Sequence, residues 1–224
     1  MTVQGATPEL SRPRAIARFY PIVDSAAWVE RIVACGARLI QLRIKERDDA
    51  HVRAEVRAAR AVCRRRATLV VNDYWQIAID EGCEFVHLGQ SDVDGADVPA
   101  LRRAGIRLGI STHDHAELDR ALALAPDYVA LGPIFPTVLK QMPWAPQGLE
   151  RITEWKRLIG AIPLVAIGGL TPERARAALA AGADSAAVVT DLVRHPQPEA
   201  RAREWVTALE PIPHDSSGNT RGRE

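Results

Sequence analysis

Short apolar runs alternate along this chain with amphipathic segments, and this alternation limits the possible folds more than any other feature of the sequence. Eight such runs occur, at Ile16–Val23, Leu39–Arg43, Thr68–Asn72, Phe85–Gly89, Arg107–Ser111, Tyr128–Ile134, Pro163–Gly168 and Ser185–Thr190. Each run is continuously apolar, which is typical of strands buried on both faces of a parallel sheet. Eight strands that alternate with helices within 224 residues predict an α/β protein with a single (β/α)8 TIM barrel.

The segments between the runs carry a helical pattern. Asp48–Arg66, Glu117–Ala125 and Pro172–Ala181 are amphipathic and rich in Ala and Arg, and Thr171 is a favourable N-cap for the last of them. An open doubly wound sheet is the alternative architecture. Its dinucleotide fingerprint GxGxxG does not follow the first strand, and no GxxxxGK[ST] phosphate loop occurs.

We expect one catalytic domain at residues 15–210, with flexible polar tails at 1–14 and 211–224. A formal net charge of +1 argues against a nucleic-acid partner, and no run of 18 apolar residues predicts a membrane span. The N-terminus lacks the apolar segment of a secretory signal, and the three cysteines show no zinc or CxxC spacing. We therefore expect a cytoplasmic protein with reduced cysteines. Barrels of this type often form homo-oligomers, but no sequence feature indicates an interface.

A basic strand end follows the second run. Gln41, Arg43 and Lys45 alternate, so their side chains are expected on one face of the strand. The active site of a barrel lies at the carboxyl ends of its strands. Two cations there would bind a phosphate or diphosphate, unless they are solvated residues of an ordinary loop.

Acidic residues follow the next two strands. Asp73 comes directly after Asn72, and Asp92 follows the run Phe85–Gly89. Mg²⁺ takes one or two carboxylates together with waters and phosphate oxygens, so this pair beside a basic strand end predicts a Mg²⁺ site. Each aspartate alone could instead cap a helix.

Glycine and hydroxyl residues follow the last three strands. Thr137 lies in a proline-rich loop, Gly168 and Gly169 end the seventh run, and Thr190 ends the eighth. Paired glycines let backbone N–H groups approach a phosphate, and this fold often binds phosphate after strands seven and eight. A tight turn without a ligand is the alternative. The two anion sites together predict displacement of a metal-bound diphosphate by a second, phosphorylated substrate.

Three further polar residues, Lys140, Ser111 and His113, complete the strand-end set. Lys140 follows the sixth strand, whereas Lys156 lies within a helical pattern, where we expect a solvated face. Ser111 could donate a hydrogen bond to a ligand or merely begin the next helix, and His113 could act as a general acid or base.

Seven stretches carry a family resemblance. They are QLRIK at 41–45, ND at 72–73, HLGQSD at 87–92, GIST at 109–112, GPIFPT at 132–137, AIGG at 166–169 and AVVT at 187–190. In this order they resemble the thiamine phosphate synthase family, a family of (β/α)8 barrels, over about residues 15–210.

The resemblance implies a Mg²⁺-dependent transferase of thiamine biosynthesis. Hydroxymethylpyrimidine diphosphate would condense with thiazole phosphate, or its carboxylated tautomer, by a dissociative route that releases diphosphate. Asp73 and Asp92 would hold the metal. The residues implied for the pyrimidine diphosphate are Gln41, Arg43, Lys45, Asn72, Ser111 and Lys140. Of these, Lys140, Ser111, Arg43 and Lys45 are the expected catalytic residues. Those implied for the thiazole phosphate are Thr137, Gly168, Val189 and Thr190.

One position departs from the family pattern PTxTK. Leu139 stands where the family usually has a second hydroxyl, before Lys140. A lost hydrogen bond is worth about 1 kcal/mol, so this change would weaken thiazole phosphate binding without abolishing activity. We hypothesise that the segment Gln141–Gly148 forms a lid, in which Trp144 or Gln147 compensates for the missing hydroxyl.

Three other functions stay open at this point. A thiazole tautomerase would keep the barrel and use His113 for proton transfer, but it would have no need of Arg43, Lys45, Asp73 and Asp92. A non-catalytic regulator would bind thiazole or thiamine phosphates without turnover. A phosphate-binding barrel of another pathway would leave the metal pair unexplained.

Overall fold

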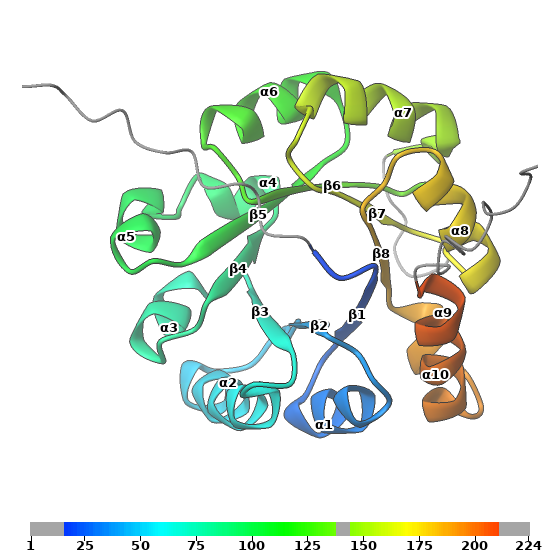
Figure 1. Ribbon diagram of the computed structural model, residues 1–224. Coiled ribbons are helices and arrows are strands. Elements are labelled where there is room, and N and C mark those ends of the chain that lie inside the picture. Colours follow the sequence, from blue (N-terminus) through cyan, green and yellow to red (C-terminus); the bar gives the residue numbers. More distant parts are fainter. Residues whose placement is uncertain (1–15, 138–143, 211–224) are drawn as a thin grey trace, which may run out of the picture.

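The computed structural model describes residues 16–137 and 144–210, in which eight parallel strands form a closed barrel in chain order (Figure 1). The strands are β1 (Phe19–Val23), β2 (Leu39–Leu42), β3 (Thr68–Asn72), β4 (Phe85–Leu88), β5 (Arg107–Thr112), β6 (Tyr128–Leu131), β7 (Leu164–Ile167) and β8 (Ser185–Val188). Parallel pairing of β1 with β8 closes the ring. The predicted (β/α)8 barrel is therefore confirmed.

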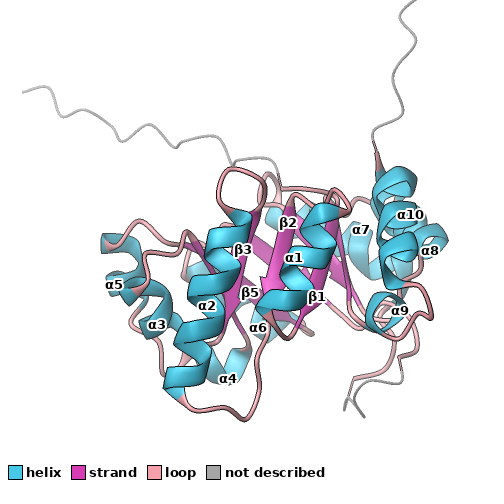
Figure 2. Cartoon of the chain, turned by 90° about the horizontal axis from the view of Figure 1, so that it is seen from below, coloured by secondary structure: helices cyan, strands magenta, loops and turns pink. Residues whose placement is uncertain are grey.

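Every strand is followed by one or two helices, which surround the barrel (Figures 1 and 2). They are α1 (Ala26–Ala34), α2 (Asp49–Cys63), α3 (Trp75–Asp80), α4 (Gln90–Val93), α5 (Val98–Arg103), α6 (His115–Ala123), α7 (Gly148–Ile159), α8 (Pro172–Ala180), α9 (Thr190–Val193) and α10 (Pro198–Leu209). Thr171 caps α8 as predicted, since its side chain accepts a hydrogen bond from the Arg174 backbone N–H. The predicted tails, 1–14 and 211–224, lie outside the described residues.

Several predicted strands were too long at one end. The run Ile16–Val23 forms a strand only from Phe19, and the run Tyr128–Ile134 stops being a strand at Leu131. The apolar residues beyond these strands pack on the barrel from its loops. Ile134 is 1% exposed, for example, although it lies beyond β6.

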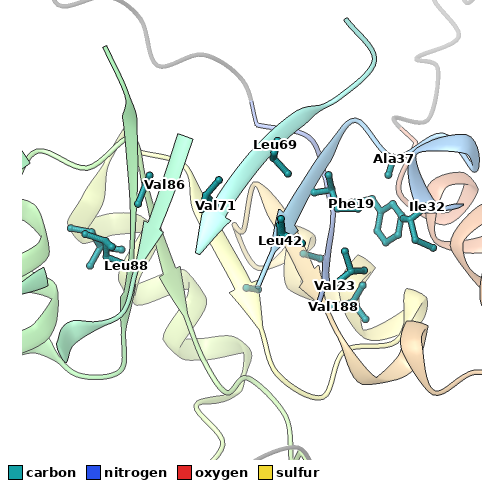
Figure 3. Packing of buried hydrophobic residues seen from close by; sticks show 14 of the residues in the cluster. Phe19, Val23, Ile32, Ala37, Leu42, Leu69, Val71, Val86, Leu88 and Val188 are labelled. Atoms are coloured by element: carbon teal, nitrogen blue, oxygen red, sulfur yellow. The ribbon is translucent and has the colours of Figure 1, made fainter. Parts of the chain in front are cut away.

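Two apolar cores lie on the two faces of the strands. The inner core contains residues such as Tyr20, Phe85 and Tyr128. The outer core joins the other strand face to the helices and includes Phe19 of β1 and Ile32 of α1 (Figure 3). Neighbouring residues of a strand point to opposite faces, so both faces need apolar side chains and the sequence shows continuous apolar runs.

Lys156 lies in the helix α7, as its pattern predicts, but its side chain is half-buried rather than on a solvated face. Its ammonium group donates hydrogen bonds to Asp184 Oδ2 at 2.7 Å and to the Ile162 carbonyl oxygen at 3.1 Å. The Asp184 carboxylate also accepts a bond from the Leu164 backbone N–H. Lys156 therefore ties α7 to the start of β7. The helical pattern alone could not show this contact, because the partners come from other elements.

The three cysteines are free and buried, as expected. Burial raises the pKa of the Cys63 and Cys83 thiols to about 11, so neither forms a reactive thiolate near neutral pH. None of the helices in the described part of the chain is long and apolar enough to cross a bilayer.

Candidate active site

A tight turn after β3 presents Asp73 at the carboxyl end of the barrel. Its backbone has a φ of 65°, which is uncommon outside glycine but is tolerated by Asp. Its N–H donates to the His87 carbonyl oxygen of the neighbouring strand at 3.0 Å, and its own carbonyl accepts from Trp75 at 2.7 Å. These bonds hold the Asp73 backbone in an unusual conformation at the barrel mouth, where strain often accompanies function.

Asp92 reaches the same place from the loop after β4. It lies in the short helix α4 and folds back over Gly89, so that a Cβ on Gly89 would lie 2.9 Å from the Asp92 carboxylate oxygen. The φ of Gly89 is −76°, a value open to any residue. The glycine is therefore needed for the position of the Asp92 side chain rather than for its own backbone.

Lys45, Asp73 and Asp92 form one charged cluster. The Lys45 ammonium donates to the Asp73 carboxylate in a short contact, and the Asp73 side chain is only 17% exposed. Burial, and then the nearby Asp73 carboxylate, raise the pKa of Asp92, whereas Lys45 opposes this rise. Two carboxylates this close repel each other unless a proton or a cation lies between them.

The chemistry of this cluster fits Mg²⁺. The described residues hold no group of three or more His, Cys, Asp or Glu side chains that could enclose a metal ion by themselves. Mg²⁺ does not need such a cage, because it binds one or two carboxylates and fills its other positions with water and phosphate oxygens. Asp73 and Asp92 are the residues that would hold it.

Of the polar residues at the end of β2, Gln41 lies inside the barrel, whereas Arg43 and Lys45 lie at its surface. Gln41 is 2% exposed and its Nε2 donates to the Tyr20 hydroxyl at 3.0 Å. Arg43 and Lys45 are exposed. Burial lowers the pKa of His87, and the nearby positive charge of Arg43 lowers it further.

A chain of hydrogen bonds inside the barrel was not foreseen from the sequence. The hydroxyls of Tyr20 and Tyr128 are 3.0 Å apart, and Tyr128 also contacts His87 Nδ1 at 2.7 Å. His87 Nε2 lies 2.9 Å from Ser111 Oγ. Burial lowers the pKa of His87 to about 4 and raises that of both tyrosines, so all three are neutral near pH 7.

Two buried polar atoms near the mouth have no hydrogen-bond partner among the described residues. They are Nδ2 of Asn72, whose residue is 5% exposed, and Oε1 of Gln90. The other amide atom of Gln90, Nε2, donates to the Ser111 carbonyl oxygen at 2.7 Å. A buried donor without a partner costs free energy, and a phosphate oxygen would satisfy Asn72. Only its place in the HLGQSD stretch distinguishes Gln90 in the sequence.

The glycines after β7 pack directly against the loop after β6. A Cβ on Gly168, whose φ is 100°, would lie 2.6 Å from Pro133 Cα. A Cβ on Gly169 would lie 2.4 Å from the Pro136 carbonyl oxygen. The loops are joined by the Phe135 N–H, which donates to the Gly168 carbonyl at 3.0 Å. These glycines therefore have a packing role, whatever they bind.

The remaining residues expected at the second anion site lie after β6 and β8. Thr137, Val189 and Thr190 are all half-buried. The helix α9 that begins at Thr190 is fixed by Asp191, which accepts two hydrogen bonds from the Arg201 guanidinium at 2.8 Å and one from Trp205 Nε1 at 2.7 Å. Hydrogen bonds from α10 to Asp191 therefore fix the position of the loop after β8.

His113 is engaged by neighbouring side chains. Its Nδ1 lies 2.7 Å from Glu117 Oε2, and its ring stacks on Trp144 with centroids 5.3 Å apart. Gln147 Nε2 donates to the His113 carbonyl at 2.7 Å. Trp144 and Gln147 therefore contact the β5–α6 loop. The rest of the hypothesised lid up to residue 143, with Leu139 and Lys140, lies outside the described residues.

Comparison with known proteins agrees with this architecture. The family model described as thiamine monophosphate synthase matches residues 19–192, which include all eight strands. The chain belongs to the thiamine monophosphate synthase family. This makes it an enzyme, a transferase of thiamine biosynthesis, as its motifs predict.

Individual relatives of this family member are similar along most of their length. The thiamine-phosphate synthase of Rhizobium etli is 61% identical over 86% of this chain and 95% of its own. That of Klebsiella pneumoniae is 48% identical over 86% of this chain and 89% of its own. Among solved structures, the thiamine phosphate pyrophosphorylase of Pyrococcus furiosus covers 86% of this chain and 95% of its own, with a TM-score of 0.75 and 25% identity.

Proposed function

We propose that this enzyme joins hydroxymethylpyrimidine diphosphate to thiazole phosphate, or its carboxylated tautomer, and releases diphosphate and thiamine phosphate, together with carbon dioxide when the carboxylated tautomer is the substrate. The observation that carries the proposal is the Lys45–Asp73–Asp92 cluster at the barrel mouth, with the Asn72 amide nitrogen unpaired beside Asp73. A diphosphate needs cations and donors, and a metal needs carboxylates. This cluster supplies both, and the identities of the relatives support it.

In this proposal, the β2–β4 side binds the pyrimidine diphosphate. Gln41, Arg43 and Lys45 bind its diphosphate, whose charge the two cations offset, and Asn72 Nδ2 donates to a diphosphate oxygen. Asp73 and Asp92 hold Mg²⁺, which when bound neutralises the charge that develops on the departing diphosphate. Ser111 and Lys140 contact the leaving group or the pyrimidine.

The bond between the pyrimidine methylene carbon and the diphosphate oxygen breaks first, and its electron pair leaves with the diphosphate. The pyrimidine stabilises the resulting carbocation, which the thiazole nitrogen then attacks. The β6–β8 side holds the thiazole phosphate through Thr137, Gly168, Gly169, Val189 and Thr190. The apolar inner core beneath the mouth excludes water, which would otherwise capture the carbocation.

The cytoplasmic location and a homo-oligomeric state stay predictions, as does weaker thiazole phosphate binding through Leu139. The tautomerase and regulator alternatives gain no support from the described residues. His113 is paired with Glu117 and stacked on Trp144, and neither alternative explains the Lys45–Asp73–Asp92 cluster.

The proposal is tested by mixing the purified protein with both substrates and Mg²⁺ and following thiamine phosphate by thiochrome fluorescence. We expect product that disappears with EDTA and returns with excess Mg²⁺. Asp92→Ala should lower the rate by at least about a hundredfold, since even groups that only support a metal ligand are worth 10–100-fold. Asp94→Ala is the matched control, because Asp94 is exposed and paired with Arg120.

Folded protein that gives no product, while the Klebsiella pneumoniae enzyme is active in the same assay, would contradict the proposed reaction. Equal losses in the Asp92→Ala and Asp94→Ala variants would contradict the assigned metal site instead.

A further inference from the structure

The buried hydrogen-bond chain from Gln41 to Ser111 crosses the barrel and ends at its mouth. It takes one residue from each of five strands, β2, β1, β6, β4 and β5, through Gln41, Tyr20, Tyr128, His87 and Ser111. Four of these residues are at most 8% exposed. Three of them, Tyr20, Tyr128 and His87, have no part in the proposed reaction, and their polar groups need a reason to lie in an otherwise apolar core.

The Gln41 amide sets the direction of the protons along this chain. An amide nitrogen only donates, so the Tyr20 oxygen accepts from Gln41. In the arrangement that we infer, the Tyr20 hydroxyl donates in turn to the Tyr128 oxygen, 3.0 Å away. The Tyr128 oxygen then accepts this hydrogen bond, and the Tyr128 hydroxyl donates its own proton to His87 Nδ1. Because Nδ1 accepts, the imidazole is neutral and carries its proton on Nε2. His87 therefore donates to Ser111 Oγ.

We propose that His87 is a positioning residue that turns the Ser111 hydroxyl proton toward the departing diphosphate. Its Nε2–H occupies an acceptor position of Ser111 Oγ, which leaves the hydroxyl proton free for a ligand at the mouth. In the opposite direction Ser111 would donate to His87 and offer only lone pairs, which repel a diphosphate oxygen. The inference rests on the proposed function for the identity of the ligand.

The direction of the chain can be measured without any substrate. In ¹⁵N-labelled full-length protein at neutral pH, two-bond ¹H–¹⁵N correlations distinguish the two imidazole tautomers, and the spectrum of His87→Gln assigns the His87 signal. We expect the Nε2–H tautomer. An Nδ1–H tautomer or a doubly protonated ring would overturn the proposal. Since this measurement needs no turnover, it is independent of whether the proposed reaction is correct.

Kinetics then test the link to Ser111. Loss of one hydrogen bond predicts that His87→Leu lowers kcat about tenfold, with the KM of both substrates within about twofold. His87→Gln keeps an N–H donor and should recover to within about threefold of the unsubstituted protein. The double variant His87→Leu/Ser111→Ala should be no slower than Ser111→Ala alone, because both changes remove the same interaction.

A double variant whose losses multiply would show that His87 acts independently of Ser111 and would overturn the proposal, as would an unchanged kcat in His87→Leu. Should His87→Leu fail to fold, Tyr128→Phe replaces it, since it removes only the hydroxyl that donates to Nδ1 and should lower kcat by the same route. If the unsubstituted protein is inactive, the proposed function is refuted. The tautomer measurement then still tests the direction of the hydrogen bonds to His87.

Discussion

On the β2–β4 side of the barrel mouth, the groups suited to bind an anion or a metal are charged and amide side chains: Arg43, Lys45, Asn72, Asp73 and Asp92. On the β6–β8 side, two loops pack on each other through Gly168 and Gly169, and the charged groups Arg174, Asp191 and Arg201 are bonded to protein groups. In the proposed function, the first side would bind its ligand through charge, so its affinity would depend on protonation and on Mg²⁺. The second side would bind through backbone shape, so its affinity would depend on the absence of Cβ atoms. The two sides should therefore fail in different ways when residues are changed.

The largest effect on the β6–β8 side is expected for Gly169→Ala. Its Cβ would lie 2.4 Å from the Pro136 carbonyl oxygen, at a φ of 64°, so the two loops must separate. We expect a loss of about 3 kcal/mol or more in the free energy of unfolding and a raised KM for thiazole phosphate. Calorimetry and steady-state kinetics measure these two effects.

Gly105→Ala is the matched control, because Gly105 has a φ of 72° but open space around its Cβ position. Backbone strain alone should cost it about 1–2 kcal/mol and leave both KM values unchanged. Equal stability and equal KM values in the two variants would show that the contact between the loops is unimportant.

On the β2–β4 side, Gly89→Ala should separate metal binding from stability. The new Cβ would lie 2.9 Å from the Asp92 carboxylate oxygen, at a φ that alanine accepts. We expect the side chain of Asp92 to move, so that the Mg²⁺ concentration giving half-maximal rate rises about three- to tenfold, with little change in melting temperature. Gly95→Ala, with its nearest neighbour 4.0 Å away, is the control. An unchanged Mg²⁺ dependence would show that Gly89 does not control the position of the Asp92 carboxylate.

The smallest effect is expected for Arg174→Gln. The Arg174 guanidinium donates to the Gly169 carbonyl oxygen at 2.7 Å and lies over the Phe135 ring at 4.9 Å, but its side chain is exposed. Exposed contacts contribute little, so we expect about a twofold rise in the KM for thiazole phosphate and none for the pyrimidine diphosphate. Arg176→Gln on the same helix serves as the control. A rise in the KM for the pyrimidine diphosphate instead would place Arg174 with the other side of the mouth.

The sequence predicted the barrel and the charged side of the mouth more fully than the glycine side. Continuous apolar runs report burial on both faces, and acids and bases directly after them are unusual enough to be noticed. The packing of Gly168 on Pro133 could not be predicted, because it depends on how two loops distant in sequence approach each other. The ion pair of Lys156 was missed for the same reason, since its partner Asp184 lies outside α7.

The interior chain shows a second limit. Tyr20, His87 and Tyr128 occupy strand positions where an apolar residue is expected, and each alone looks like a core aromatic. Only the closed ring brings the hydroxyl of β1 to that of β6, because these strands are not neighbours in the sheet. A polar atom in a continuous apolar run is a weak signal until its partners are known.

The most direct test of the difference between the two sides is calorimetric binding of inorganic diphosphate and of thiazole phosphate, each measured with and without Mg²⁺. We predict that diphosphate binding requires Mg²⁺ and is lost in Asp92→Ala, whereas thiazole phosphate binds equally well in all conditions. Diphosphate binding that is indifferent to both Mg²⁺ and Asp92, or thiazole phosphate binding that depends on them, would contradict the division of the mouth into a charged side and a backbone side.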